Sequence, residues 1–500
     1  MTPEYIIVQA GGKGTRLGKL TKNKPKALVP VDNLPMLFHL FKKYPVSNFI
    51  IIGDYKIDVL KRYLCAFAKV NYKVVNASGH TGTCAGISEA LKEIPTQTPF
   101  MLIWSDLVLP LDFEIPEAHS NMVGLSQGFQ CRWRYSEAGF EEIPSNNSGV
   151  AGLFVFQDKK MIETIPLDGE FVRWLKTEKL EFQKLLLSQT NEYGLIEVYN
   201  NLELKKCRPF NQIEISGDKV VKRPLDENGK MLAEREKKWY NAARAANFSA
   251  IPQIYNEKPL ILERIYGRNV YECTELSLGQ KSDVLKKIVL CLKKLHLICE
   301  QPVDRRSVYE TYVDKTFDRL EKIRNLVPFA TEKKVIINGK PCRNIFFHRE
   351  EIKQRIEECM PESFCFIHGD CTFSNIILKN DSVPIFIDPR GYFGHTDLYG
   401  DEDYDWAKLY YSLRGDYDQF NLKRFSLEIR STDIIMNIES NGWNELEDDF
   451  FSLIGGTSKE NKIKLLHALI WLSLTTYAWE NYDSICGAFY NGLWYLEEVL

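Results

Sequence analysis

The chain has 500 residues, of which 44% are hydrophobic and 12% aromatic, so it is long enough to bury more than one hydrophobic core. Its 64 basic and 67 acidic residues leave a formal charge of −3, which provides no overall positive field for nucleic acid or for an anionic membrane. Two domains are therefore expected, and nucleic acid is not an expected partner.

The cysteines, the first residues and the most apolar late segment suggest where the protein resides. Twelve cysteines are scattered along the chain, with no C-x-x-C pair and no cysteine–histidine spacing of the zinc type, which favours reduced thiols and a cytoplasmic protein. The first residues, MTPEYIIVQAGG, lack the basic segment and long apolar run of a signal peptide. The apolar segment LLHALIWLSLTTYAW is too short to cross a bilayer, so a buried helix and no membrane insertion are expected.

The first half of the chain alternates short apolar runs with segments of helical periodicity. The apolar runs lie at 5–8, 48–54, 72–77 and 100–106, and the helix-like segments lie between them at 34–44, 57–68 and 86–94. Such alternation predicts βαβ units and a parallel sheet covered on both faces, which is an α/β domain. A further strand is expected at 149–158, and helices are expected around 170 to 188.

The rhythm changes near residue 207. The segment CRPFNQIEISGDKVVKRP predicts two short strands around a Gly-Asp turn. We place the domain boundary here, which gives domains of 1–206 and 207–500. Beyond it the sequence predicts a long helix at about 279 to 298, a motif-bearing block at 364 to 405, and a mostly helical tail rich in Trp and Tyr.

A glycine-rich loop follows the first predicted strand, in QAGGKGTRLGKLTKNKPKALVPV. Gly11, Gly12 and Gly14 allow the backbone to approach a triphosphate closely, and N–H groups at a following helix start can point at its oxygens. Arg16 and Lys26 supply cations for the charge on the phosphates. The loop is neither a Walker loop, which needs Gly-Lys-Ser/Thr, nor a G-x-G-x-x-G loop.

This string resembles the signature G-G-x-G-T-R-L followed by P-K-x-L-x-P-V of the sugar-1-phosphate nucleotidyltransferases. The resemblance is close over residues 4 to 110 and looser to about 205, and it implies a Rossmann-like nucleotidyltransferase domain that binds an NTP. It implies that Gly11, Gly12, Gly14 and Thr15 contact the nucleotide. It also implies two catalytic cations, Arg16 on the phosphates and Lys26 near the phosphoryl group under attack.

Four further segments fit the same resemblance. GHTGTCAGISEAL looks like the family's loop near the base, which Gly82 and Thr83 would approach. Asp106, at the end of FMLIWSD, matches the family's Mg²⁺-binding Asp, although an Asp after a strand is also a common cap or turn residue. Gly152 in VAGLFVF and Glu170 in DGEFVRWL are candidates for substrate contacts, and ordinary packing or surface roles stay open for both.

The sequence departs from the family's pattern at two points. Gln9 stands where the family usually has Leu, which is expected to alter the base pocket. The second metal carboxylate has no clean match in LIEVYNNLEL, and four candidates stay open: Glu197, Asn200, Asn201 and Glu203.

The segment FIHGDCTFSNI carries an acid and an amide five residues apart. Phosphoryl transfer to a hydroxyl needs a carboxylate that orients or deprotonates the acceptor and oxygen ligands that hold Mg²⁺ on the ATP phosphates. Asp370 can supply the first, while Asn375 and Asp388, which ends PIFID, can supply the second. His-Gly-Asp alone would indicate a turn, but H-G-D-x-x-x-x-N followed by I-D, each flanked by strand-like runs, indicates a site.

This arrangement resembles the aminoglycoside phosphotransferase and choline kinase family, which shares the protein-kinase-like fold. The resemblance implies an α+β phosphotransferase domain in which Asp370 is the catalytic base and Asn375 and Asp388 bind Mg²⁺. His368 would orient this loop, and Asp405, in GDEDYDWAKL, would hold it.

The resemblance is weaker in the segment before this block. Lys222 in GDKVVKRP would be the phosphate-binding lysine and Glu236 in EREKKWY its partner, with Glu234 as an alternative. LILERIYG would form the hinge, with Glu263 and Arg264 near the adenine of ATP. A surface lysine on an edge strand remains an alternative for Lys222.

Together the two resemblances imply consecutive reactions. The second domain would phosphorylate a small sugar or polyol with ATP, and the first would couple the phosphomonoester to an NTP, most readily CTP or UTP. Mg²⁺ would serve both, and the product would be an activated precursor for capsule or cell-wall polysaccharide. Two alternatives stay open: a choline kinase with phosphocholine cytidylyltransferase, for which the aromatic tail would offer a cation–π box, and a non-catalytic nucleotide-binding regulatory protein.

Overall fold

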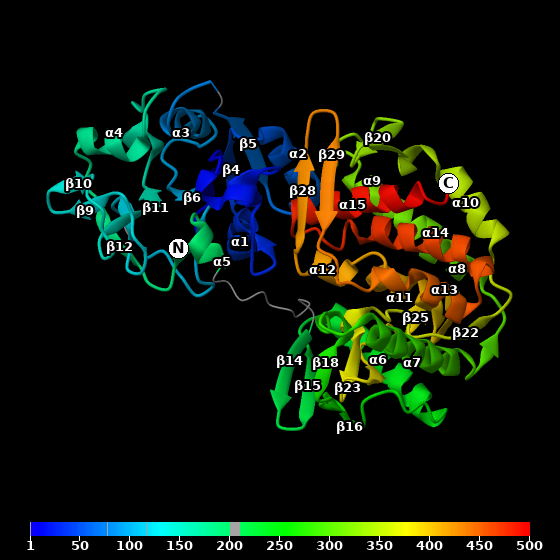
Figure 1. Ribbon diagram of the computed structural model, residues 1–500. Coiled ribbons are helices and arrows are strands. Elements are labelled where there is room, and N and C mark those ends of the chain that lie inside the picture. Colours follow the sequence, from blue (N-terminus) through cyan, green and yellow to red (C-terminus); the bar gives the residue numbers. More distant parts are fainter. Residues whose placement is uncertain (1, 78, 118, 201–210) are drawn as a thin grey trace. The chain divides into compact units, whose positions relative to one another are not determined.

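The computed structural model describes residues 2–77, 79–117, 119–200 and 211–500 (Figure 1). The contacts divide the chain into two compact units, Met1–Lys205 with Trp479–Asp483, and Lys206–Ala478 with Ser484–Leu500. The domain boundary predicted between residues 206 and 207 lies outside the described residues.

The first unit is built on a mixed sheet of nine strands. Its parallel part has the order β6 (Phe100–Trp104), β1 (Tyr5–Gln9), β4 (Asn48–Gly53) and β5 (Tyr72–Asn76). The remaining strands are β8 (Met122–Ser126), β9 (Arg134–Ser136), β10 (Gly139–Glu141), β11 (Gly149–Phe156) and β12 (Gln183–Leu187). Strands β1, β4 and β6 are continuous apolar runs because helices cover the sheet, and the predicted α/β fold is confirmed.

Helices and short elements complete this unit. The helices are α1 (Met36–Lys43), α2 (Ile57–Phe67), α3 (Cys84–Leu91), α4 (Phe171–Glu178) and α5 (Ile196–Asn200). The short elements are η1 (Thr15–Thr21), η2 (Lys26–Leu28), β2 (Pro30–Val31), β3 (Leu34–Pro35), β7 (Leu107–Val108), η3 (Lys159–Ile162) and β13 (Asn191–Glu192).

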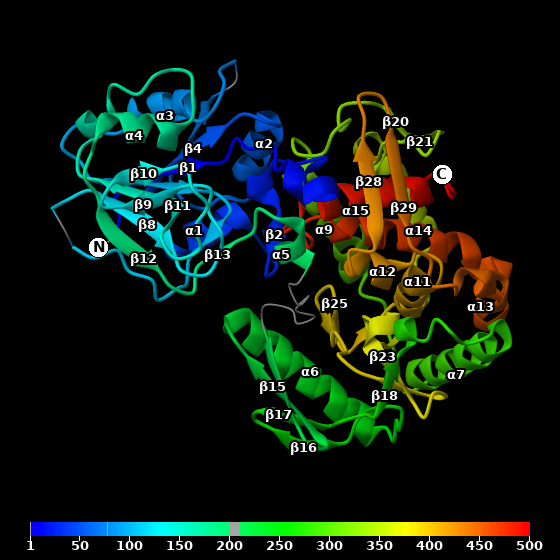
Figure 2. The ribbon, with the colours of Figure 1, turned by 60° about the vertical axis from the view of Figure 1, so that its left-hand side comes forward.

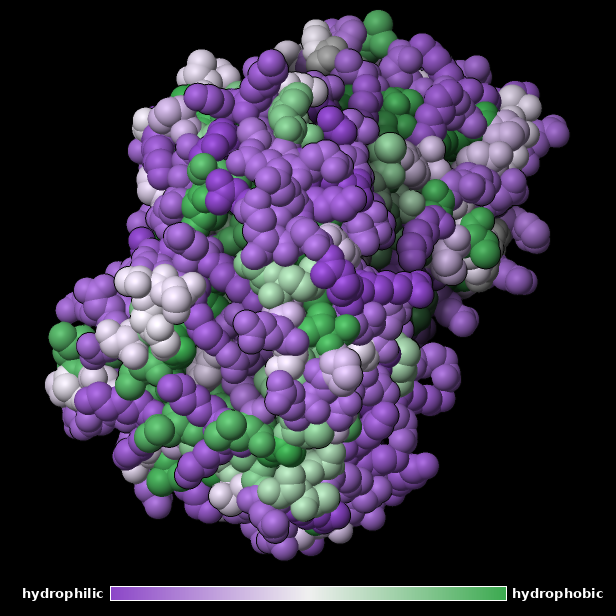
Figure 3. Space-filling view, turned by 90° about the vertical axis from the view of Figure 1, so that its right-hand side faces the viewer, coloured by the Kyte–Doolittle hydropathy of each residue, from purple (hydrophilic) through white to green (hydrophobic). Residues whose placement is uncertain are grey.

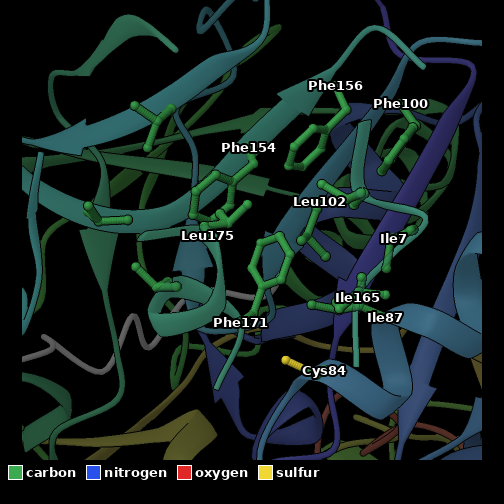
Figure 4. Packing of buried hydrophobic residues seen from close by; sticks show 14 of the residues in the cluster. Ile7, Cys84, Ile87, Phe100, Leu102, Phe154, Phe156, Ile165, Phe171 and Leu175 are labelled. Carbon is green, nitrogen blue, oxygen red and sulfur yellow. The ribbon is translucent and has the colours of Figure 1, made fainter. Parts of the chain in front are cut away.

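Aromatic side chains form much of the core between the sheet and α3 and α4 (Figure 4). The Phe171 ring, from α4, lies 5.4 Å from the ring of Phe154 and 6.3 Å from that of Phe156, both on β11. Cys84 and Ile87 of α3 are fully buried in the same cluster. This core fixes α3 and α4 on the sheet, and with them the loops that lead into both helices.

The helices expected around 170 to 188 are only partly right. Helix α4 ends at Glu178, where Lys179 adopts a left-handed φ of 52°, and β12 follows, pairing in parallel with β8. Leu185 and Leu187 are buried while Leu186 is 53% exposed, so burial alternates with the period of a strand. The run of three leucines concealed this period in the sequence.

The second unit begins with a four-stranded antiparallel sheet. Its order is β14 (Asn211–Ser216), β15 (Lys219–Pro224), β17 (Leu260–Glu263) and β16 (Ile254–Glu257). Helix α6 (Glu227–Ala245) packs against this sheet (Figure 2), and the Asp226 carboxylate caps it by accepting from Gly229 N at 2.7 Å. The two strands predicted around the Gly-Asp turn are confirmed.

The rest of the second unit is mainly helical. Its helices are α7 (Leu278–His296), α8 (Arg305–Tyr309), α9 (Lys315–Ile323), α10 (Arg349–Glu358), α11 (Glu402–Leu413), α12 (Tyr417–Asn421), α13 (Glu447–Ile454), α14 (Thr457–Leu474) and α15 (Tyr482–Leu496). Single turns lie at η4 (Val270–Glu272), η5 (Glu310–Asp314), η6 (Ile345–Phe347), η7 (Phe373–Asn375) and η8 (Asn444–Leu446).

Small sheets connect these helices. One contains β18 (Gly267–Asn269), β23 (Ile376–Lys379) and β24 (Val383–Phe386), and a second contains β19 (Glu300–Gln301), β22 (Phe364–Phe366) and β27 (Tyr399–Gly400). A third contains β20 (Lys334–Ile337), β21 (Lys340–Arg343), β28 (Phe425–Ile429) and β29 (Ile434–Ile438), and a two-stranded ribbon pairs β25 (Tyr392–Phe393) with β26 (Thr396–Asp397). The predicted helical tail therefore also contains the hairpin β28–β29.

Helix α14 confirms the buried helix predicted for the apolar late segment. Trp471 is fully buried, with its ring 4.7 Å from that of Tyr411 and 5.0 Å from that of Phe420. Trp471 is thus a core residue, as expected for helix packing. Among the described residues, no helix combines the length and the apolar character that crossing a membrane requires. The face shown in Figure 3 is mostly hydrophilic, with hydrophobic residues in small scattered groups.

Candidate functional sites

The glycine-rich loop of the first unit connects β1 to η1. Gly14 has a left-handed φ of 62°, and a Cβ there would lie 2.9 Å from Thr21 Cγ2 and 3.0 Å from Lys26 Cβ. Gly14 is thus required by the backbone conformation and by the close approach of Lys26. A Cβ on Gly12 would meet nothing within 4 Å, and Gly12 is exposed, which leaves its backbone accessible to a ligand. Gly11 is buried against Asp54.

Two carboxylates, Asp106 and Glu192, meet beside Lys26. Lys26 Nζ forms an ion pair with the buried Asp106 carboxylate, which also shares a hydrogen bond with Glu192. Pairing of β13 with β7 brings the two acids together, and Tyr193 N donates to Asp106 O at 3.0 Å. Burial, and then the charge on Asp106, raise the pKa of Glu192 to about 7.

The two cations predicted from the loop differ in their surroundings. Lys26 is half-buried in its ion pair with Asp106, whereas Arg16 and Thr15 are exposed at the start of η1. The positive charge of Arg16 opposes the rise in the pKa of Glu192, so Arg16 lies near the same acidic pair. The structure therefore brings Arg16, Lys26 and Asp106 to one place.

Gly194 leaves the oxygens of the two carboxylates free of a covering side chain. A Cβ on Gly194 would lie 2.0 Å from Glu192 Oε1 and 3.0 Å from Asp106 Oδ2, so only glycine leaves these oxygens uncovered. Paired carboxylate oxygens are the ligands that Mg²⁺ prefers, and the residues present fit this ion. Glu192 is thus a candidate for the second metal carboxylate.

Sequence reasoning missed Glu192. Of the four candidates that it left open, Glu197 and Asn200 lie on α5, and Asn201 and Glu203 lie outside the described residues. A strand of two residues, Asn191–Glu192, carries too little pattern to be recognised. The signal is its pairing with β7, directly after Asp106, which only the folded chain provides.

The loop at Gly82 and Thr83 packs against the start of α4. Gly82 has a φ of 88°, and a Cβ there would lie 2.2 Å from Gly169 O. Thr83 N donates to Gly169 O at 2.9 Å, and Thr83 Oγ1 accepts from Phe171 N at 2.9 Å. These bonds fix the loop beside Glu170.

The two predicted substrate residues have structural surroundings of their own. Gly152 has a φ of 87°, and a Cβ there would lie 2.7 Å from the Trp104 ring, which explains this glycine by packing. Glu170 accepts from Trp133 Nε1 at 3.1 Å and lies 3.3 Å from the Arg132 guanidinium. Substrate contacts from both residues stay predictions.

Gln9 ends β1 beside the glycine-rich loop. Its Oε1 is buried and has no hydrogen-bond partner among the described residues. An unsatisfied amide oxygen is costly in a closed core, so its place next to the loop fits a donor group of a bound nucleotide.

The second site is built around the loop that carries Asp370. Lys408 Nζ, on α11, lies 3.0 Å from the Asp370 carboxylate. Asn375 Nδ2 donates to Asp370 O at 2.7 Å and to Asp370 Oδ2 at 3.3 Å. Gly369 has a φ of 79°, which turns the chain so that Asp370 and Asn375 lie on one side of the loop.

A buried carboxylate holds this loop. Asp405, fully buried at the start of α11, accepts from His368 N at 2.8 Å, from Gly369 N at 2.7 Å and from His296 Nε2 at 3.1 Å. His368 Nε2 lies 3.1 Å from Ile387 O, and burial lowers the pKa of this imidazole. A neutral His368 that donates from Nε2 therefore links the loop to the segment that carries Asp388.

Lys222, Glu236 and Asp388 form a third part of the second site. Lys222 Nζ lies 2.6 Å from Glu236 on α6 and forms an ion pair with Asp388. Burial lowers the pKa of Lys222, but the charges of Asp388 and Glu236 outweigh burial and raise it. The alternative partner Glu234 instead pairs with Lys237 and is 59% exposed.

The backbone aligns these parts. Ile387 N donates to Asn375 O and Arg390 N donates to His368 O, both at 2.9 Å, so the Asp370 loop and the Asp388 segment lie side by side. The Asp388 carboxylate and the Asn375 amide oxygen are oxygen ligands that fit Mg²⁺. Glu263 stands apart from this group, because its carboxylate pairs with Lys379 at 3.3 Å.

We expect Asp405→Asn to loosen the Asp370 loop. The amide keeps one oxygen but turns an NH₂ group toward a buried N–H donor, which costs about 1–3 kcal/mol of stability in the second unit. Denaturant unfolding followed by Trp fluorescence measures this loss. The control is Asp283→Asn on α7, where the side chain is 72% exposed, and an equal effect of the two variants would contradict the assigned role.

Comparison with protein families gives two matches. Residues 6–113 match the MobA-like NTP transferase domain, and residues 212–419 match the phosphotransferase enzyme family. The predicted resemblances are thus confirmed for both halves of the chain, and both families are transferases.

Curated relatives match the first half of the chain. A D-glycero-alpha-D-manno-heptose 1-phosphate guanylyltransferase of Campylobacter jejuni is 32% identical over 95 residues, which are 18% of this chain and 43% of the relative. A glucose-1-phosphate cytidylyltransferase of Salmonella typhimurium is 41% identical over 64 residues, 12% of this chain and 25% of the relative. The chain thus matches less than half the length of these relatives.

Solved structures are similar to each half. HddC from Yersinia pseudotuberculosis is 20% identical, with a TM-score of 0.34, over 40% of this chain and 97% of that one. The gentamicin–APH(2")-IIa complex is 18% identical, with a TM-score of 0.36, over 60% of this chain and 95% of that one.

Proposed function

We propose that this chain, which joins a MobA-like NTP transferase domain to a phosphotransferase-family domain, catalyses two consecutive reactions on one small hydroxyl compound. In the first, the acceptor oxygen bonds to the γ-phosphorus of ATP, the bond to the bridging oxygen breaks, and ADP leaves. In the second, the new phosphomonoester attacks the α-phosphorus of an NTP and pyrophosphate leaves. One domain thus makes the substrate of the other.

The arrangement around Asp370 is the observation that carries the kinase proposal. Asp370 accepts the proton of the acceptor hydroxyl, and Lys222, oriented by Glu236, binds the ATP phosphates. Asn375 and Asp388 would hold Mg²⁺, which when bound neutralises phosphate charge. The neighbouring backbone hydrogen bonds support this assignment, because they align the loop and the metal-ligand segment.

In the first unit, Lys26 and Arg16 have the corresponding role for the nucleotidyl transfer. Their cations stabilise the charge on the α-phosphate and on the leaving pyrophosphate. Asp106 and Glu192 would hold Mg²⁺, and the exposed backbone of Gly12 binds the triphosphate. Gly82 and Thr83 approach the base.

The compound is proposed to be sugar-like, with CTP or UTP as the second nucleotide and a surface polysaccharide as the destination. The support is that the relatives named above act on sugar 1-phosphates, one as a cytidylyltransferase. The choline alternative has less support, because Trp471, one ring of the aromatic tail, lies in the core. A purely regulatory protein does not need the paired acids and cations that both sites retain.

The test is a coupled assay of the full chain. The protein is incubated with ATP, Mg²⁺, each of the four NTPs in turn, and a panel of sugars, polyols, their acids and amino alcohols. We expect ADP with an acceptor alone, and pyrophosphate once a matching NTP is added. If neither product forms with any acceptor, the proposed function is wrong.

A further inference from the structure

Four cationic side chains gather around Asp370. Lys315 and Arg319 lie on α9, Arg390 follows β24, and Lys408 lies on α11. The ion pair of Lys408 with Asp370 balances one of these charges. For the other three, no carboxylate partner is found within residues 211–500. The cluster therefore carries an excess of positive charge.

The contacts of these three cations are with neutral groups. Arg390 donates to the hydroxyl oxygens of Tyr392 and Tyr404, both at 2.9 Å. Arg319 Nη1 donates to Ser473 O at 2.6 Å. For the Lys315 ammonium, no hydrogen bond or ion pair with a described side chain is found.

The excess charge acts on Lys315. Burial, and then the positive charges of Arg390, Arg319 and Lys408, lower the pKa of Lys315 to about 6, although Asp370 opposes this. Part of this shift is repulsion by the neighbouring cations, which a bound anion would offset. The contacts with neutral groups and the repulsion among the cations both indicate a cluster without a balancing negative charge.

A cavity opens onto this cluster. Lys315, Arg390, Tyr392 and Tyr404 line it together with Thr311, whose hydroxyl is buried with no hydrogen-bond partner among the described residues. Glu310 is the carboxylate among the lining residues, and it pairs with His395. Arg390 also borders the Asp370 loop, through its N–H bond to His368 O, so the cavity adjoins the proposed catalytic base.

We propose that this cavity binds an anionic group of the acceptor, a carboxylate or a phosphate, so that the compound phosphorylated at Asp370 is a hydroxylated acid. The proposal deepens the kinase function and rests on it. Charge-assisted hydrogen bonds from Arg390 and Lys315 would hold the anion, and the Thr311 hydroxyl would gain a partner. A neutral polyol would leave the cations unbalanced, and an amino alcohol such as choline would be repelled.

Matched acceptor series test the charge of the substrate. ADP formation by the full chain is measured with glycerol, glycerate, glycerol 3-phosphate and ethanolamine, and with glucose, gluconate, glucose 6-phosphate and glucosamine. We expect kcat/KM for an anionic member to exceed that for its neutral analogue about tenfold or more. The acid and phosphate arms distinguish the two anions. A neutral or cationic member that reacts best overturns the proposal and leaves the kinase function intact.

Absence of ADP with every acceptor would instead contradict the kinase function. A binding measurement then tests the anion site in the cavity separately from the kinase function. Sulfate and inorganic phosphate are titrated into the full-length wild type and into Lys315→Met, and binding is measured by calorimetry. Binding that the variant loses supports the anion site, and equal binding or no binding overturns it.

Variants assign the effect to the cavity. We expect Lys315→Met and Arg390→Gln to raise KM for the anionic acceptor about tenfold or more, with KM for ATP unchanged. Lys322→Met, on the same helix but exposed, is the matched control. An increase in KM for ATP would place the cations on the nucleotide phosphates and overturn the proposal, and an equal loss with a neutral acceptor would indicate a structural role.

The pH dependence of binding gives a second signature. Arg390, Arg319, Lys408, Asp370 and the Glu310–His395 pair surround Lys315. Without a ligand the pKa of Lys315 is about 6. A bound anion stabilises the charged ammonium and raises this pKa, so binding above pH 6 is coupled to the uptake of a proton by Lys315. The affinity for the anionic acceptor is then expected to fall as the pH rises from 6 to 8. We expect Lys315→Met to remove most of this pH dependence. A wild-type slope that the variant retains contradicts the role of Lys315.

Discussion

Asp370→Asn is expected to lower ADP formation by about 10²- to 10⁴-fold, which is the usual contribution of a general base. The amide keeps the shape of the side chain and its place beside Lys408, but it cannot accept the acceptor's proton. Pyrophosphate release from a supplied phosphomonoester and NTP is expected to stay at the wild-type rate, because it depends on the first unit.

Two measurements make this result decisive. Asp381→Asn, at an exposed position of the second unit, controls for the loss of a carboxylate and is expected to retain kinase activity. Thermal unfolding shows whether the variant is folded. Loss of both ADP and pyrophosphate in a folded Asp370→Asn protein would contradict two independent sites.

Loss of the cation at the first site is expected to have a comparable effect. Lys26→Met is predicted to reduce pyrophosphate formation by about 10²- to 10³-fold, the scale seen when one charge-stabilising group is removed. ADP formation by the second unit is expected to remain. Measurement of pyrophosphate with a supplied phosphomonoester and each NTP checks the prediction.

The controls separate chemistry from folding. Lys26→Met leaves the Asp106 and Glu192 carboxylates without their cation, which can destabilise the first unit. Asp106→Asn is therefore made as a second variant, because it removes one of the two buried negative charges. Lys19→Met, exposed on η1, controls for charge on the loop. If Lys26→Met and Lys19→Met had the same activity, Lys26 would not be a catalytic cation.

Motifs with short, rigid spacing could be predicted from the sequence, as could strongly periodic elements. Strands β1 and β4 are continuous apolar runs, and Asp370 and Asn375 share one loop, so the local pattern is enough to place them. The resemblance to the phosphotransferase family predicted Lys222 and Glu236 as partners, and the structure pairs them at 2.6 Å.

Features that depend on pairing between distant segments could not be predicted. Glu192 meets Asp106 through a strand of two residues, and β12 is a strand only because β8 lies beside it. Lys315, Arg390 and Lys408 lie on three separate segments, and no spacing in the sequence brings them together. Each of these sets is produced by tertiary packing, which overrides local propensity.

The ion pair of Lys26 with Asp106 has a consequence for the order of binding. In it, the ammonium occupies the place of the positive charge that a divalent cation would bring to the carboxylate. A free divalent cation must therefore compete with the Lys26 ammonium for the Asp106 carboxylate, so its net gain in binding free energy is small. A cation that arrives with a triphosphate offers the displaced ammonium new anionic partners in the same event. We therefore expect metal and nucleotide to bind to this site together, with the metal replacing Lys26 beside Asp106.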